Sequence, residues 1–313
     1  MTNKTEPGVA FLQAAINAVS VILPCKNEEN AIQLTIAGIH QALRITELDY
    51  EIIVVDDGST DQTQERALAA GARVLVHEIN MGYGNAIMDG IKVARYPVVA
   101  ILDADGTYDP AVLPTMIAAL SRHDMVVGQR QWTPDNTSMT GRIMRKSLYY
   151  IIYMLSGISA PDFNSGYRVF HKYNILDYRS LLCPTFSFTT SLTVLFLQKP
   201  YSVFFMPITY SKRIGRSKVH YIKDALRTFS YVVAISSVLR PFRINLIIVA
   251  AAFLTNLLIL LVSFILPMGM TTQTGLHLLV SLPLLIVTIS LDTFVNSQVY
   301  KNQVNHRANP TLP

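Results

Sequence analysis

Short apolar runs alternate with longer helical stretches through residues 19–128, and this alternation constrains the fold more than any other feature. Between the runs, apolar residues recur at helical spacing, which predicts helices there. This order is typical of βαβ units, so we predict an α/β domain with a mainly parallel sheet and helices on both faces. The predicted strands are Val19–Leu23, Glu51–Val55, Arg73–His77, Val98–Leu102 and Asp124–Gly128.

A polar cluster directly follows each of three of these strands: PCKNEE at 24–29, DDGSTD at 56–61 and DADG at 103–106. In parallel sheets, ligands bind beyond the carboxyl ends of the strands. We therefore predict that the three clusters form one nucleotide-type site, although the pattern does not identify the nucleotide.

Asp103 and Asp105 stand one residue apart at the end of a buried strand. Like charges at this spacing repel each other and raise each other's pKa unless a cation is bound. Mg²⁺ or Mn²⁺ would neutralise them, since both ions prefer carboxylate oxygens and leave positions for phosphate oxygens. The alternative is an Asp-Gly turn that caps the next helix. The other strand-end clusters favour the metal.

The C-terminal part of the chain is strongly apolar. Ile244–Leu266 carries no charge over 23 positions, roughly 34 Å of helix and enough to cross a bilayer. Gly275–Leu291 is a second uncharged run, with Pro283 inside it; proline is tolerated in membrane helices. Either run alone is compatible with a buried core helix, but two in tandem predict a transmembrane hairpin.

Positive charges flank this hairpin. Arg240 and Arg243 precede it, Lys301 and Arg307 follow it, and the loop 267–274 has no Lys or Arg. The positive-inside rule then predicts a multi-pass protein of the inner (cytoplasmic) membrane, with its N-terminal domain and both termini in the cytoplasm. We divide the chain into a cytoplasmic domain over 1–218, amphipathic juxtamembrane helices over 219–243, two transmembrane helices over 244–300 and a cytoplasmic tail over 301–313.

Two further stretches are basic. Residues 129–146 contain several cations and a single acid, Asp135, and Tyr210–Lys218 contains cations and no acid. A solvated surface explains either stretch, but the nearby membrane segments favour contact with phosphate or lipid. The array of basic and aromatic residues typical of nucleic-acid binding is lacking, so we expect no nucleic-acid partner. Homo-oligomerisation stays open.

Six motifs in order resemble the family-2 glycosyltransferases, and within them the polyprenyl-phosphate glycosyltransferases of the dolichol-phosphate mannose synthase group. The resemblance runs from Val19 to Lys218 and rests on LPCKNEE, EIIVVDDGSTD, GYGNAIMDG, LDADGTYDP, D-x-N-S-G-Y-R and R-x-G-x-S-K. It implies the nucleotide-sugar-binding A-type fold, which is Rossmann-like. Two C-terminal spans match the membrane-anchored members of the group.

The resemblance also implies roles for individual residues. Asp103 and Asp105 hold the metal and the diphosphate, and one of Asp56 and Asp57 contacts the base. Predicted catalytic residues are Asp105, Asp162 and Arg213. Predicted nucleotide-sugar contacts are Pro24, Lys26, Glu28, Asp56, Asp57, Gly82, Gly84, Asp103 and Lys218. Predicted contacts to the acceptor phosphate are Arg130, Arg142, Arg145, Lys146 and Ser217.

The chain departs from the family pattern at a few of these motifs. Tyr83 and Asn85 stand where the glycine turn often carries a basic residue, and Lys26 stands where an aromatic is frequent. Thr107 occupies the position at which some relatives have a Gln that serves as a further metal ligand.

The predicted reaction is metal-dependent, inverting transfer of a sugar from a UDP- or GDP-linked donor to undecaprenyl or dolichyl phosphate. One alternative is a processive polysaccharide synthase, but those enzymes carry Q-x-x-R-W, which Gln129–Trp132 does not match. A second alternative is a non-catalytic membrane adaptor on a transferase fold. Loss of a DxD aspartate would favour it, and both are present.

Overall fold

The computed structural model describes residues 16–131, 139–211, 213 and 221–265, and isolated positions between 283 and 294. Along the chain the elements are β1 (Ala18–Cys25), α1 (Ile32–Arg44), β2 (Asp49–Asp56), α2 (Thr63–Ala69), β3 (Arg73–Val76), α3 (Tyr83–Val93), β4 (Val98–Ile101), η2 (Pro110–Val112), α4 (Leu113–Leu120), β5 (Met125–Arg130), α5 (Met139–Ser156), β6 (Arg168–His171), α6 (Tyr173–Leu176), η4 (Arg179–Leu181), α7 (Phe188–Gln198), β7 (Val203–Ile208), α8 (Tyr221–Leu239) and α9 (Pro241–Ile265).

Seven strands form one sheet in the order β3-β2-β1-β4-β6-β5-β7. All neighbours pair in parallel except β6, which is antiparallel to both β4 and β5. The five predicted strands correspond to β1–β5, so the prediction of a mainly parallel α/β sheet is confirmed.

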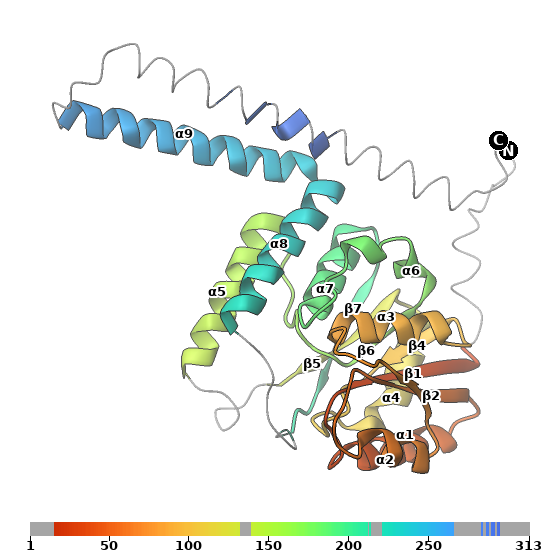
Figure 1. Ribbon diagram of the computed structural model, residues 1–313. Coiled ribbons are helices and arrows are strands. Elements are labelled where there is room, and N and C mark those ends of the chain that lie inside the picture. The colour runs from red at the N-terminus through yellow and green to blue at the C-terminus, as the bar shows by residue number, and fades with distance from the viewer. Residues whose placement is uncertain are drawn as a thin grey trace, which may run out of the picture.

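Helices cover both faces of the sheet (Figure 1). On one face, α1 buries Ile32, Ile36, Ile39 and Leu43, one helical stripe, against the apolar side chains of β1 and β2. On the other face, α3 and α7 cover the sheet, and α5 and α8 add side chains to the same core. The strand ends between these layers stay free of helices, and the polar loops lie there.

The antiparallel strand β6 decides which segments meet at that edge. Arg168, its first residue, pairs with Ile101 at the end of β4. Because β6 runs against β4, the residues that precede it, 162–167, lie beside the residues that follow β4. Neither the direction of β6 nor its place between β4 and β5 was predicted from the sequence.

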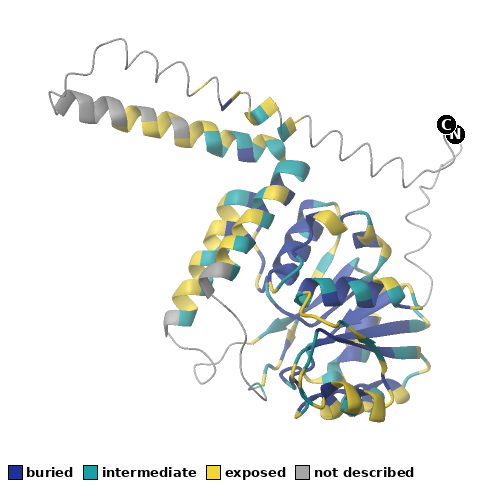
Figure 2. Ribbon diagram, viewed as in Figure 1, coloured by how far each residue is buried: buried dark blue, intermediate teal, exposed yellow. Residues whose placement is uncertain are grey.

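Helices α8 and α9 end the continuously described chain, and α5, which precedes β6 in the sequence, packs against both. In Figure 1, α5 and α8 lie side by side against the domain, and α9 extends away from it. Most described residues along α9 are exposed (Figure 2). Helix α5 runs from Met139 to Ser156, so its basic first half is helical as well as its apolar second half.

The membrane prediction is only partly tested. Among the residues that the structure describes, no single helix is both long and apolar enough to span a bilayer. Asp224–Leu239 and Pro241–Thr255 meet that test as a pair, and the pair is bent by 118°. The second predicted span lies outside the described residues apart from isolated positions, as does the predicted tail 301–313.

Candidate active site at the carboxyl ends of the strands

Hydrogen bonds fasten the loop after β1 to the loop after β2. The Asn27 N–H donates to Ser59 Oγ at 2.8 Å, and Asn27 Oδ1 accepts from the Thr60 N–H at 2.8 Å. The next N–H, that of Glu28, donates to Thr63 Oγ1 at 2.9 Å. Asn27 has a φ of 50°, a conformation that asparagine tolerates better than most residues. The first two predicted clusters are thus joined to each other. Lys26 and Glu28 lie in the joined loop, whereas Pro24 is buried within β1.

Asp56 and Asp57 have different surroundings. Asp56 Oδ1 accepts from the Ser59 N–H at 2.9 Å, which closes a local turn. The Asp57 carboxylate accepts from the N–H groups of Met81 at 2.7 Å and Gly82 at 2.8 Å. Asp57 therefore orders the glycine turn before α3. A contact from either aspartate to the base stays a prediction.

Gly82 and Gly84 allow a close approach to the backbone before α7. A Cβ on Gly82 would lie 2.7 Å from the Pro184 carbonyl oxygen, and one on Gly84 would lie 2.1 Å from that of Cys183. Gly82 also has a φ of +100°. We predicted that these glycines let the chain pass close to the nucleotide. In the structure they let it pass close to the segment that starts at Cys183.

Asp105 has two polar neighbours. Its Oδ1 accepts from the Thr107 hydroxyl at 2.7 Å and from the Thr107 N–H at 3.1 Å. Its Oδ2 lies 3.3 Å from Arg213 Nε, and Arg213 Nη2 donates to Glu28 Oε1 at 2.5 Å. The predicted residues Glu28, Asp105 and Arg213 are thus brought together. Thr107, which stands where relatives have Gln, orients Asp105 in this chain.

Asp103 is largely enclosed by protein. Its Oδ1 accepts from the Tyr83 hydroxyl at 2.7 Å. Burial, together with the charge of Asp105, raises the pKa of Asp103 to about 6, although the Tyr83 hydrogen bond acts in the opposite direction. The raised pKa agrees with the repulsion between the two carboxylates that the sequence predicts.

The two aspartates suit a divalent cation as donors, because both offer hard oxygens and their charges repel in the absence of a cation. Across the described residues, no group of three or more His, Cys, Asp or Glu side chains is arranged to hold a metal. The remaining ligands would then be phosphate oxygens and water, as in sites where a metal binds together with a diphosphate.

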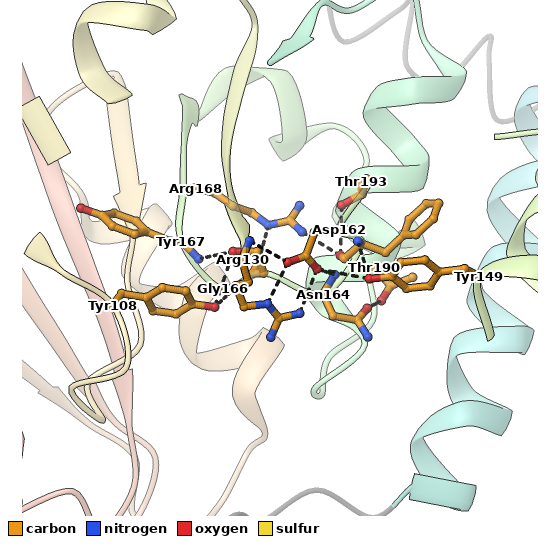
Figure 3. Close-up of polar contacts among 12 residues, drawn as sticks. Tyr108, Arg130, Tyr149, Asp162, Asn164, Gly166, Tyr167, Arg168, Thr190 and Thr193 are labelled. Atoms are coloured by element: carbon orange, nitrogen blue, oxygen red, sulfur yellow. Dashed lines mark hydrogen bonds and ion pairs between the residues drawn. The ribbon is translucent and has the colours of Figure 1, made fainter. Parts of the chain in front are cut away.

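Arg130 and Asp162 form a buried ion pair (Figure 3). Arg130 Nε and Nη2 donate to the two oxygens of Asp162, each at 2.8 Å. The N–H groups of Arg130 and Asn164 and the hydroxyl of Tyr149 also donate to this carboxylate. Burial would raise the pKa of Asp162, but the hydrogen bonds and charge of Arg130 hold it below its usual value. We assigned one residue to the acceptor and the other to catalysis; the structure pairs them with each other.

Several residues that the motif analysis did not single out build the same region. Arg168 is fully buried and donates to the carbonyl oxygens of Ser165 and Phe163, which holds the loop before β6 in place. Burial lowers the pKa of Arg168 to about 10. The N–H of Gly166 donates to the Tyr108 hydroxyl at 2.8 Å. The only sequence signal for them is membership of the D-x-N-S-G-Y-R and DADGTY motifs.

The predicted basic residues of α5 differ in exposure. Arg142 and Lys146 are exposed, whereas Arg145 is partly buried, and burial lowers its pKa. Arg142 and Arg145 lie seven and four residues before Tyr149, so all three share one helix face. Tyr149 contacts Asp162, and this face therefore leads to the buried ion pair. Ser217 and Lys218 lie outside the described residues.

The arrangement agrees with the result of comparing the chain with known families. The model for glycosyl transferase family 2 matches residues 20–178, which include both the DADG and the D-x-N-S-G-Y-R segments. The chain belongs to glycosyl transferase family 2. This membership confirms the resemblance inferred from the six motifs.

Two curated relatives match part of the chain. An uncharacterized glycosyltransferase of Mycobacterium tuberculosis is 40% identical over 116 residues, which are 37% of this chain and 50% of that protein. The undecaprenyl-phosphate 4-deoxy-4-formamido-L-arabinose transferase of Proteus mirabilis is 30% identical over 166 residues, 51% of each protein. The matched region thus spans about half the length of these curated relatives.

A similar fold is also found among solved structures. The crystal structure of glucosyl-3-phosphoglycerate synthase from Mycobacterium tuberculosis, in complex with Mn²⁺, UDP-glucose and phosphoglyceric acid, aligns with a TM-score of 0.57. It is 20% identical, and the alignment covers 74% of this chain and 86% of that one. At this identity the likeness shows the fold.

Proposed function

We propose that the chain transfers one sugar from a nucleoside-diphosphate sugar to a polyprenyl phosphate at a membrane surface, with inversion at the anomeric carbon. The observation that carries this proposal is the grouping of Asp103, Asp105, Glu28 and Arg213 at the carboxyl ends of the strands. A cationic face of α5, which leads to the Arg130–Asp162 pair, supports it. Relatives named as undecaprenyl-phosphate sugar transferases support the same acceptor class.

Asp103 and Asp105 are the proposed holders of Mg²⁺ or Mn²⁺. Bound there, the ion would neutralise the charge that develops on the nucleoside diphosphate as this leaving group separates from the sugar. Arg213 already lies between Glu28 and Asp105, so its guanidinium is placed to stabilise a diphosphate at this position. Thr107 keeps one oxygen of Asp105 engaged and thereby fixes the orientation of the other.

The proposed acceptor is an anion before the reaction begins, since a phosphate monoester is mostly dianionic near pH 7. Its main obstacle is repulsion from the donor diphosphate, and little general-base help is required. Arg142, Arg145 and Lys146 offset that repulsion and guide the phosphate along α5. Asp162 holds Arg130 at the inner end of this path.

Exposed apolar side chains support a membrane location. Helix α5 exposes Ile143, Met144, Tyr150, Ile151 and Met154. Helix α9 exposes a second apolar set: Phe242, Leu246, Val249, Phe253, Leu254, Leu257 and Leu258. Apolar patches of this extent are uncommon on soluble monomers and mark interaction surfaces. We propose that residues 244–300 form the membrane hairpin and that the polyprenyl chain stays in the bilayer.

The test is a product analysis. The full chain is purified in detergent, returned to vesicles with undecaprenyl phosphate, and supplied with a panel of UDP- and GDP-linked sugars and Mg²⁺ or Mn²⁺. Mass spectrometry is expected to show a lipid phosphate carrying one sugar, and NMR of the product gives the anomeric configuration. Asp105→Asn and chelation by EDTA are the matched controls and should abolish the product.

Other outcomes identify the alternatives. A polymer of many sugars would indicate a processive synthase. Saturable donor binding with no turnover, in the presence of metal and lipid, would indicate an adaptor. Full activity in EDTA would contradict the metal assignment while leaving the acceptor class in place.

A further inference from the structure

We infer that Tyr83 and Gly166 are positioning residues that hold the Asp103 carboxylate at the donor site from two sides. This inference rests on the proposed function, because it concerns the cation held by Asp103. Neither residue was assigned such a role by the motifs: Tyr83 stood out only as a departure from the family pattern, and Gly166 only as a member of D-x-N-S-G-Y-R.

Tyr83 holds one oxygen of the carboxylate. Its hydroxyl donates to Asp103 Oδ1 at 2.7 Å. A phenol is neutral, so it orients the carboxylate without cancelling the charge that attracts a cation. A lysine or arginine in this place would pair with Asp103 and compete with the cation. A neutral donor therefore suits a cation-binding aspartate better than a basic residue does.

The position of the Tyr83 ring is fixed independently of Asp103. Tyr83 is the first residue of α3 and follows Gly82, whose N–H is held by Asp57 at 2.8 Å. Its ring stacks on Phe186, with centroids 5.6 Å apart and planes 14° apart. The hydroxyl therefore reaches Asp103 from a fixed base, which is required of a positioning residue.

Gly166 confines the carboxylate from the other side. A Cβ on Gly166 would lie 2.5 Å from Asp103 Oδ2 and 2.7 Å from Oδ1. Its φ lies outside the left-handed region, so space and not backbone conformation requires glycine here. The Gly166 N–H donates to the Tyr108 hydroxyl at 2.8 Å, and Tyr108 follows Asp103 by five residues. Asp103 is therefore enclosed by its own loop and the loop before β6.

The experiment measures Mn²⁺ binding, not turnover. The full chain in detergent is titrated with Mn²⁺, with and without UDP, and free Mn²⁺ is measured by electron paramagnetic resonance. For Tyr83→Phe we expect affinity about tenfold weaker, the scale of one lost hydrogen bond to a charged group, with thermal unfolding unchanged. Gly166→Ala should weaken binding at least as much, because the methyl group displaces the carboxylate.

Tyr50→Phe is the matched control, since it removes a partly buried hydroxyl that contacts His40 on the far side of the sheet. It should bind Mn²⁺ as the unmodified chain does. Equal affinity in Tyr83→Phe and the unmodified chain would overturn the inference. Failure of the unmodified chain to bind Mn²⁺ with or without UDP would instead overturn the proposed metal site.

Discussion

Two groupings of carboxylates with an arginine lie at the same edge of the sheet, Arg130 with Asp162 and Arg213 with Glu28 and Asp105. They differ in how many of their hydrogen bonds are made to other protein groups. Asp162 is 0% exposed and accepts five hydrogen bonds, three of them from Arg130. Arg213 is 27% exposed and is divided between Glu28 and Asp105. The first grouping has its polar capacity filled by protein. In the second the guanidinium stays partly exposed, so we expect this grouping to be open to a ligand. We therefore expect similar residue types at similar places to serve architecture in one case and the proposed chemistry in the other.

The largest expected effect is on stability, at the buried pair. Asp162→Ala leaves the Arg130 guanidinium buried without its carboxylate, which is expected to cost about 3–5 kcal/mol of unfolding free energy. Thermal and denaturant unfolding of the full chain in detergent measure this. Arg130→Met combined with Asp162→Leu should recover part of the loss. An Asp162→Ala protein of normal stability would remove the contrast between the two groupings.

At the open grouping, the expected effect is on activity and not on folding. Asp105→Asn should lower product formation by about 100- to 1000-fold, the scale of losing one electrostatic group that stabilises a transition state. Unfolding should stay within a few degrees of the unmodified chain. Initial rates and a melting curve on the same preparation check both parts. If the variant loses activity only to the extent that it unfolds, Asp105 has a structural role and not a catalytic one.

Asp103 is expected to cost stability in the metal-free protein. The pKa of Asp103 in the folded protein, about 6, lies above its ordinary value. The folded state therefore tolerates the protonated carboxyl better than the charged carboxylate. The contribution of this carboxyl is lost as the pH rises from about 4 through 6. Asp103→Asn should therefore stabilise the protein in EDTA by about 1–2 kcal/mol at pH 7.5 and by much less at pH 4.5. Melting curves at both pH values measure the difference; an equal gain at the two would contradict it.

The smallest expected effect concerns the exposed cations of α5. Arg142→Gln and Lys146→Gln should each weaken binding to vesicles containing anionic lipid by about fivefold, since a cation near such a surface contributes about 1 kcal/mol. The effect should disappear at high salt. Vesicle sedimentation measures it, with Arg44→Gln, at the end of α1, as the control. Loss that persists at high salt would indicate that these cations have a structural role.

Much of the fold was predictable because local patterns carry it. The β-branched runs became β1–β5, and the helical spacing of Ile32, Ile36, Ile39 and Leu43 became the buried face of α1. That the three strand-end clusters would meet was predictable for the same reason, since carboxyl ends of parallel strands share an edge. The extent of α5 was not, because its first half is basic and carries no apolar stripe.

The contacts within the site were harder to predict than the residues that form it. Arg130 and Asp162 are 32 residues apart and meet through the antiparallel strand β6, a direction that no local pattern encodes. The same strand places Gly166 on Asp103. Each such contact depends on how two loops pack, and packing is a property of the folded chain.

The sequence by itself determined the family, the class of sheet and the identity of the carboxylates and cations at its edge, because composition and spacing are local. Only the tertiary structure decided which of those charges are paired with each other and how far each pair is buried. The physical reason is that burial and hydrogen bonding set the state of a charge, and both come from segments far apart in the chain.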